Sequence, residues 1–269
     1  IPAVDYSEGV KTAYPQGAQA KEFILPKELL EQDCVISLSK MKTHALERIT
    51  GAVKNSYGFV YGFHKAKGHT QYPSADSFAR MLIDLNKCVA PKLYVMDGIV
   101  AMEGNGPGSG DPVPMNVLLM STDPVALDSV FSRLVYLKPE MVPTNYHGEK
   151  MGLGTWKEEE ITLLTPDGEI SMAEAVKKYG NPAFNVDRTE VRKNIWTRMA
   201  GALNIFQKKP YIEADKCVRC GICVQSCPVP GKAVDFRKGK GKPPVYDYRK
   251  CIRCFCCQEM CPKKAIKVK

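Results

Sequence analysis

Nine of the 11 cysteines lie between residues 217 and 269, and eight of them form two runs of one spacing, C-x2-C-x2-C-x3-C-P. The first run is Cys217, Cys220, Cys223 and Cys227, and the second is Cys251, Cys254, Cys257 and Cys261. Three closely spaced thiolates can bind three irons of one cubane cluster, and the fourth, held away by the turn before proline, can reach a neighbouring cluster. The pattern predicts two [4Fe–4S] clusters as cofactors.

Two other uses of cysteine fit this spacing less well. Structural zinc takes four ligands in a tetrahedron, usually as two separated pairs. A disulfide framework needs an oxidising compartment and is typical of small secreted domains. Cys256 lies beside Cys257 and competes with it for a place in the second run. Choosing Cys257 restores the spacing of the first run, so we interpret Cys256 as a spare thiol packed nearby.

The duplicated motif resembles the bacterial-type ferredoxin, which carries two [4Fe–4S] clusters. This resemblance implies that the fourth cysteine of each run serves the cluster of the other run. One cluster would be held by Cys217, Cys220, Cys223 and Cys261, and the other by Cys251, Cys254, Cys257 and Cys227. Because so small a module has little core, bound clusters must supply much of its stability.

A second set of candidate residues follows the short apolar run 34–38. If that strand stays extended, Lys40, Lys42 and His44 project to one side, because side chains alternate along a strand. Lys54 and Asn55 follow closely. Cations and a neutral imidazole near the C-terminal end of a strand are suited to an anion, since ligands bind there in open α/β sheets. These five residues are the predicted binding or catalytic site, and solvated lysines are the alternative interpretation.

Further features near this site are individually weak. The glycine-rich loop 104–110 could offer backbone N–H groups to a phosphate or carboxylate, although such loops are usually turns. Asp97 and Glu103 could act as general acid or base, or bind an additional metal. Asp123 and Asp128 are interpreted as a helix cap and a packing or surface residue.

Alternating apolar runs and amphipathic stretches must position these side chains. Strands are predicted at 34–38, 93–96, 117–120 and 161–165. Helices are predicted at 27–32, 75–89, from about 122 to 137, and from a capping box at 171–174 to about 180. The pattern indicates an α/β layered domain, 1–180, followed by a linker with one helix, 181–210, and a small α+β ferredoxin-like two-cluster domain, 211–269. The linker helix is expected near 191–205, and residues 1–20 are expected to be connecting structure.

Charge is unevenly distributed along the chain. Residues 207–269 hold 16 Lys or Arg against five Asp or Glu, whereas the remainder is slightly acidic, within a net charge of +9. This excess fits an acidic redox partner protein, together with the simpler interpretation that local Lys and Arg balance the charge of the reduced clusters and keep the domain soluble. Nucleic acid and an anionic membrane surface are weaker candidates. No stretch approaches the 18 or more apolar residues of a membrane span. The cysteine usage predicts a reducing cytoplasm, although a chain that begins with Ile1 leaves an upstream targeting segment open.

Five motifs of the first half resemble one family in their order and content. They are Leu38–His44, Thr50–Asn55, Met96–Ile99, Glu103–Pro107 and Asp123–Asp128. The resemblance is to the domain of unknown function 362, covers about residues 24–150, and often accompanies a fused ferredoxin module. Family members usually carry a further α/β segment ahead of the position of Ile1. The family name implies no reaction.

Two functions follow from these patterns. The first is a ferredoxin-fused oxidoreductase of unknown substrate, in which the clusters relay single electrons to an anionic substrate or cofactor at the α/β domain. The second is a non-catalytic electron carrier or adaptor that docks a partner oxidoreductase. Neither a flavin nor a nicotinamide attachment signal is visible, and nothing resembles a nucleophile–base triad.

Overall fold

A computed structural model describes residues 5–62, 64–190 and 209–268. The centre of the first part is a four-stranded mixed sheet in the order β4-β3-β5-β6. These strands are β4 (Arg48–Thr50), β3 (Ile36–His44), β5 (Leu93–Glu103) and β6 (Asp111–Ser121). β3 and β5 run parallel, whereas β4 and β6 pair antiparallel with their neighbours. The strands predicted near 34, 93 and 117 are present, and each is longer than its apolar run.

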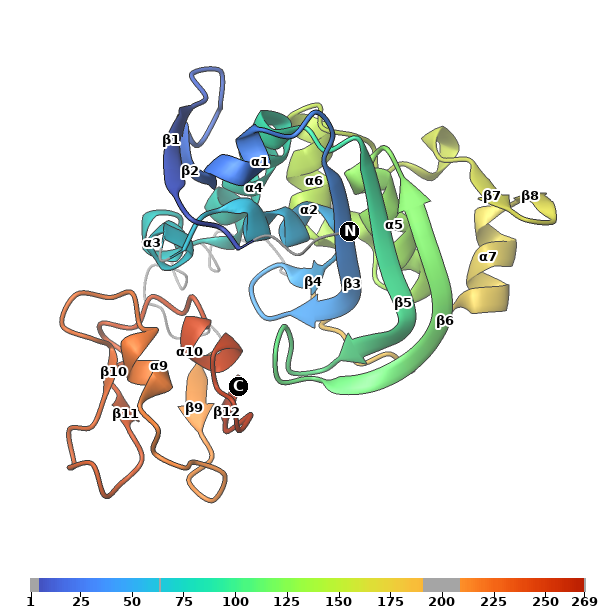
Figure 1. Ribbon diagram of the computed structural model, residues 1–269. Coiled ribbons are helices and arrows are strands. Elements are labelled where there is room, and N and C mark those ends of the chain that lie inside the picture. Colours follow the sequence, from blue (N-terminus) through green and yellow to red (C-terminus); the bar gives the residue numbers. More distant parts are fainter. Residues whose placement is uncertain (1–4, 63, 191–208, 269) are drawn as a thin grey trace, which may run out of the picture.

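Helices cover one face of this sheet (Figure 1). α2 (Ala52–Asn55) and α5 (Pro124–Leu134) contact the strands, and α4 (Ala75–Val89) and α6 (Pro143–Lys150) pack beside them. Met41 and Met96 of the sheet and Phe131 of α5 are fully buried in the same core cluster. The mixed α/β content predicted for this part is confirmed.

Capping residues begin the longer helices where the sequence indicates. The Ser74 side chain accepts from the Ser77 backbone N–H in a capping box, and α4 occupies the predicted range 75–89. Asp123 caps α5 ahead of Pro124 at the first helical position, although α5 ends at residue 134 rather than 137. Ser171 and Glu174 form the predicted capping box of α7 (Met172–Tyr179).

Shorter elements complete the first part. They are β1 (Gly9–Ala13), β2 (Glu22–Pro26), α1 (Lys27–Leu30), η1 (Ser56–Phe59), α3 (His64–Gln71), η2 (Pro139–Met141), η3 (Glu158–Glu160), β7 (Leu163–Thr165) and β8 (Gly168–Ile170). β1 and β2 form an antiparallel hairpin, so the expectation of connecting structure before residue 20 is wrong. β7 and β8 form a second hairpin.

The opposite face of the sheet carries apolar side chains toward solvent. Leu38 of β3 and Met120 of β6 are 73% and 63% exposed. Both align with Val95 of β5 in one row across the sheet. Among the residues that the structure describes, no helix covers this row.

The first part extends past the expected boundary at residue 180. Phe184 is fully buried and packs edge-on to Phe131, with ring centroids 6.2 Å apart. Arg188 donates from Nη2 to the backbone oxygens of Val135 and Phe184. Residues 181–190 therefore belong to this core, and the linker helix predicted near 191–205 lies outside the described residues.

The C-terminal module has two small antiparallel ladders. β9 (Pro210–Ile212) pairs with β12 (Ile266–Val268), and β10 (Val234–Asp235) pairs with β11 (Val245–Tyr246). Each of these four strands contains one apolar residue that flanks the cysteine runs, namely Ile212, Val234, Val245 or Ile266. α9 (Ile222–Gln225) and α10 (Cys256–Glu259) each follow a cysteine loop. None of the helices in the described part of the chain combines the length and apolarity that crossing a bilayer requires.

Candidate functional site: the cysteine loops and the cavity beside them

The eight motif cysteines surround two separate small voids. One void is lined by Cys217, Cys220, Cys223 and Cys261. The other is lined by Cys227, Cys251, Cys254 and Cys257. Each void thus receives three cysteines from one run and the last cysteine of the other, which is the grouping that the ferredoxin resemblance implies. All 11 cysteines are free thiols.

The two loops share one backbone path. Arg219 and Arg253 both have φ of +57°, and Gly221 and Phe255, two residues further on, are also left-handed at +77° and +61°. Each path leads into a short helix whose second residue is a void-lining cysteine. Cys257 therefore corresponds to Cys223.

By the same correspondence, Cys256 takes the place of Ile222. Both residues line a different, larger cavity and not the voids. This placement agrees with the interpretation of Cys256 as a spare thiol.

Hydrogen-bond donors reach several of the void-lining sulfurs. The Ala233 backbone N–H donates to Cys227 Sγ and that of Ala265 to Cys261 Sγ, both at 3.3 Å. Tyr246 Oη donates to Cys257 Sγ at 3.1 Å. Donors to sulfur stabilise thiolate ligands and influence cluster potentials.

The donor set fits a [4Fe–4S] cluster in each void. Four sulfurs spread around each space, and within the described ranges no three His, Cys, Asp or Glu side chains converge as they do around a single metal ion. Burial, reinforced by the neighbouring thiols, raises the pKa of Cys223 to about 11. Since cluster ligation requires deprotonated thiols, loading such a site releases protons.

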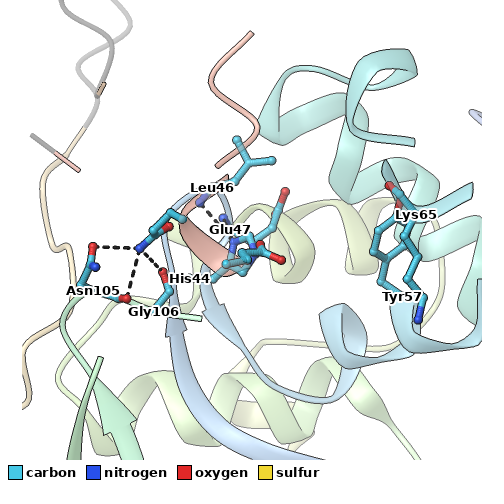
Figure 2. Close-up of polar contacts among 9 residues, drawn as sticks. His44, Leu46, Glu47, Tyr57, Lys65, Asn105 and Gly106 are labelled. Carbon is cyan, nitrogen blue, oxygen red and sulfur yellow. Dashed lines mark hydrogen bonds and ion pairs between the residues drawn. The ribbon is translucent and has the colours of Figure 1, made fainter. Parts of the chain in front are cut away.

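A glycine-rich loop of the first part holds the cysteine module. The fully buried Gln258 of α10 donates from Nε2 to Asn105 O at 3.1 Å, Asn105 Oδ1 at 2.8 Å and Gly106 O at 2.9 Å. Figure 2 shows the dashed bonds that end on Asn105 and Gly106. Asn105 Nδ2 in turn donates to Ile266 O at 3.0 Å, and Lys264 Nζ to Gly110 O at 3.1 Å.

Close packing explains the glycines of this loop. A Cβ at Gly106 would overlap the carbonyl and hydroxyl oxygens of Thr43, and one at Gly108 would lie 2.9 Å from Glu259 O. The loop therefore contacts protein on both sides. In the described structure the loop docks the module, and the phosphate contact considered from the sequence stays a prediction.

His44 forms a second link across the interface (Figure 2). Its Nε2 lies 3.1 Å from Glu259 Oε1, while its Nδ1 accepts the backbone N–H groups of Leu46 and Glu47, both at 3.1 Å. With Nδ1 occupied as an acceptor, the proton of the neutral ring sits on Nε2 and is donated to the carboxylate. Burial, and then the Lys54 ammonium, lower the pKa of His44 to about 4.

A cavity of about 800 Å³ lies where the two parts meet. From the first part it is lined by Lys42, Thr50, Lys54, Asn55, Tyr57, Gly58, Gly62, Lys65 and His69. From the module it is lined by Ile222, Gln225, Ser226, Cys227, Pro228, Lys232, Cys256, Glu259 and Met260. Its volume falls in the range of small-molecule and cofactor sites.

Cations dominate the charge of this cavity. Lys42, Lys54 and Lys65 form no ion pair within the described residues. Burial, then repulsion from Lys54, lowers the pKa of both Lys42 and Lys65. Burial opposes ionisation of Glu259, but Lys54 and the bonded His44 hold its pKa at about 2. With Lys232, which also forms no ion pair in the described structure, four lysines share the cavity with one carboxylate, which favours an anionic ligand.

Two residues that line this cavity also carry a buried polar atom without a partner. Thr50 Oγ1 and His69 Nδ1 make no hydrogen bond in the described structure, although their residues are only 2% and 4% exposed. His69 is held by Phe78, with stacked rings 4.5 Å apart. Unpaired buried groups are costly, so such atoms point to a bound water or ligand.

The five residues predicted from the sequence separate into three places. Lys42, Lys54 and Asn55 line the cavity. His44 lies at the docking contact with Glu259. Lys40 is on the exposed sheet face, where its Nζ is 2.5 Å from Asp97 Oδ2.

The acidic residues named from the sequence have structural partners. Asp97 pairs with Lys40, and Glu103 Oε2 accepts the Asn185 backbone N–H at 2.7 Å. Asp128 is fully buried and accepts the N–H groups of Ala52 and Val53, which positions α2. Asp123 is the cap of α5.

Sequence reasoning missed the module's share of the cavity. Glu259, Cys256 and Lys232 lie about 160 residues or more from Lys42 and Lys54. Their position beside the cluster motifs was the one feature of the sequence that pointed to a functional role. No local pattern indicates which face of the module contacts the first part of the chain.

Two family models match the chain. Residues 1–133 match the Domain of unknown function (DUF362), and residues 209–262 match the 4Fe-4S dicluster domain. Both matches confirm the resemblances drawn from the motifs. The chain is also similar to the thylakoid-associated protein sll1697 of Synechocystis sp. (strain ATCC 27184 / PCC 6803 / Kazusa), with 42% identity over 130 residues. That match covers 48% of this chain, and it spans only 40% of the relative's length.

Proposed function

Because residues 1–133 match the DUF362 model and residues 209–262 match the 4Fe-4S dicluster domain, we propose that this chain is an iron–sulfur oxidoreductase that passes single electrons to an anionic small molecule. The acceptor, a substrate or a cofactor, binds in the interdomain cavity. The supporting observation is the position of Cys227. This residue lines both the second cysteine void and the cavity.

In this proposal two [4Fe–4S] clusters are the cofactors and supply reversible one-electron transfer when bound. Cys217, Cys220, Cys223 and Cys261 hold one, and Cys227, Cys251, Cys254 and Cys257 hold the other. The remaining contribution of the chain is to bind and orient the acceptor.

The cavity residues divide that work. Lys42, Lys54 and Lys65 attract the anion and oppose its negative charge. Thr50 and His69 lie beside these lysines, and each carries one polar atom without a described partner, Oγ1 and Nδ1 respectively. Glu259, which is tied to His44, disfavours acceptors with negative charge on its side of the cavity.

Single-turnover reoxidation tests this function. Holoprotein is reduced anaerobically and mixed with small carboxylates, phosphate esters and nucleotide cofactors while the cluster absorbance is recorded. At least one anion should accelerate reoxidation, and Lys42→Met and Lys54→Met should each abolish most of that acceleration. Lys177→Met, on the exposed side of α7, is the control.

Two results would contradict the proposal. One is reoxidation that no anion accelerates. The other is an acceleration that survives both cavity substitutions while the clusters remain intact. The second result would favour the alternative function, a carrier or adaptor that passes electrons to a docked partner without using the cavity.

The proposed location is a reducing cytoplasm, because the cysteine pattern is that of cluster ligands and not that of a disulfide framework. The similar Synechocystis protein is described as thylakoid-associated. Cell fractionation distinguishes a freely diffusing protein from one bound at a membrane surface.

A further inference from the structure

The two groups of void-lining cysteines differ in their access to solvent. In the first group Cys220 is exposed and Cys217 and Cys261 are half-buried. In the second group Cys227, Cys254 and Cys257 are buried. Only the second group contributes a residue to the interdomain cavity. The module therefore has an outer end at Cys220 and an inner end at Cys227.

Unpaired cations gather at the outer end. They are Arg219, Lys238, Lys240, Lys242 and Lys263, here termed the distal basic face. All five are exposed, and none forms an ion pair with any described residue. The nearby carboxylate of Glu213 is paired with Lys216 at 2.7 Å.

Specific contacts bring this set together around the first void. Arg219 Nη1 donates to Gly241 O at 3.2 Å, which joins the loop 236–244 to the first cysteine loop. Arg219 and Lys263 line the same void as Cys217 and Cys220. In Figure 1 the loop between β10 and β11 lies on the side of the module away from the four-stranded sheet.

The basic loop has a fixed backbone. Gly239 N–H donates to Phe236 O at 3.0 Å, and Lys242 N–H donates to Gly239 O at 3.2 Å. Gly239 has φ of +86°, which suits glycine in a tight turn. The lysines of this loop therefore project from a hydrogen-bonded turn.

An apolar side chain lies within this face. Val218, between Cys217 and Arg219, is 53% exposed. Apolar area framed by charge is the arrangement of a transient protein interface, whereas polyanion binding needs only the charge.

The simpler explanation is that these cations compensate the charge of bound clusters. Hydrogen bonds to cysteine sulfur in the described structure include those from the N–H groups of Ala233 and Ala265 and from Tyr246 Oη. None of these comes from the five cations of the distal basic face. The five cations are exposed to solvent, so they remain accessible to a partner even if they also balance the charge of a cluster.

We propose that the distal basic face docks an acidic electron-donor protein beside Cys220. In the step, the reduced donor loses one electron and this chain gains it, with no covalent bond formed or broken and no proton required. The proposal concerns where electrons enter. It holds whether or not the cavity binds an anionic acceptor, so its test is independent of reoxidation.

Charge reversal tests the docking directly. The probe is an acidic flavodoxin in its hydroquinone form, whose absorbance differs from that of iron–sulfur clusters. Holoprotein carrying Lys238→Glu, Lys240→Glu and Lys242→Glu is compared with a control carrying Lys92→Glu, Lys177→Glu and Lys178→Glu. The control has the same net charge, and its three exposed lysines lie on the first part of the chain.

Two quantities are measured at several salt concentrations: the affinity for oxidised flavodoxin by calorimetry, and the second-order rate of electron transfer by stopped flow. At low salt the first variant should lose about tenfold or more in both, because steering by complementary charge has that scale. The control should change by less than about threefold, and added salt should reduce the difference between the variants.

Equal losses in the two variants would overturn the proposal, since net charge alone would then explain them. Unchanged affinity and rate would also overturn it. Loss of binding to DNA or to phosphatidylserine vesicles with flavodoxin unaffected would assign the face to a polyanion instead. If the triple variant loses iron, the single Lys240→Glu, whose side chain makes no described contact, decides between these outcomes.

Discussion

Gln258 and Gly106 lie 152 residues apart in the sequence, yet the side-chain amide of the first donates to the carbonyl oxygen of the second at 2.9 Å. The same amide also reaches Asn105, so one buried side chain makes three hydrogen bonds across the interface. The cavity between the two parts depends on this contact, because it fixes α10 against the glycine-rich loop.

Replacing Gln258 with Ala should weaken this docking. The change leaves the buried carbonyl groups of Asn105 and Gly106 without a donor, at a cost of about 1–3 kcal/mol. Hydrogen exchange of loop 104–110 should accelerate and the thermal unfolding midpoint should fall. Gln71→Ala, at an exposed position of α3, is the control and should change neither quantity. An unaltered exchange rate in Gln258→Ala would show that other contacts hold the module.

The backbone correspondence between the two cysteine loops separates Cys256 from Cys257. Cys256→Ala should keep about eight iron atoms per chain, since it leaves both sets of four ligands intact. Cys257→Ala should lose about half of that iron or convert the second cluster to a three-iron form. Iron analysis and paramagnetic resonance measure both results. The reverse outcome would place Cys256 in the ligand set.

Cys261 tests the exchange of ligands between the runs. It lies in the second run but lines the void of the first. Cys261→Ala should therefore alter the cluster at Cys217, Cys220 and Cys223, and Cys227→Ala should alter the other cluster. Paramagnetic resonance of the reduced variants distinguishes the two lesions. A lesion in the second cluster of Cys261→Ala would show that each run serves its own cluster.

His44 should remain neutral at acidic pH. Its folded pKa of about 4 lies below its ordinary value of 6.5, because burial and Lys54 oppose the imidazolium. The unfolded chain takes up the proton first, so the stability that neutral His44 contributes is complete above pH 6.5 and is lost as pH falls toward 4. Histidine ¹⁵N chemical shifts should report an Nε2–H tautomer at neutral pH. An imidazolium signal near pH 6 would contradict the hydrogen bonding described.

Local chemistry made much of this structure predictable. The cysteine spacing indicated the two ligand groups, since each loop follows the same left-handed path through Arg219 or Arg253. Capping residues indicated the starts of α5 and α7, and apolar periodicity indicated α4. Strand ends were less predictable, because polar residues such as Lys42 continue β3 through pairing with β4 and not through burial.

The composition of the cavity could not be read from the sequence. Side-chain alternation predicts Lys40 and Lys42 on one face of β3. In the structure the register of the β3–β5 pairing shifts between these two residues, and Lys40 forms an ion pair with Asp97. The opposite wall comes from a module whose orientation depends on Gln258 and the glycine-rich loop. This docking depends on complementary surfaces that lie far apart in the sequence, so the periodicity of apolar residues does not predict it.

The double position of Cys227 has a thermodynamic consequence. An anion bound in the cavity next to Cys227 would repel an electron added to the cluster that Cys227 holds. A bound anion would therefore make this cluster harder to reduce. Because such coupling is reciprocal, reduction of the cluster would lower the affinity of the cavity for the anion by the same factor. Charging the protein would thus help to expel a spent anion, and the resting oxidised form would be the one that captures the next.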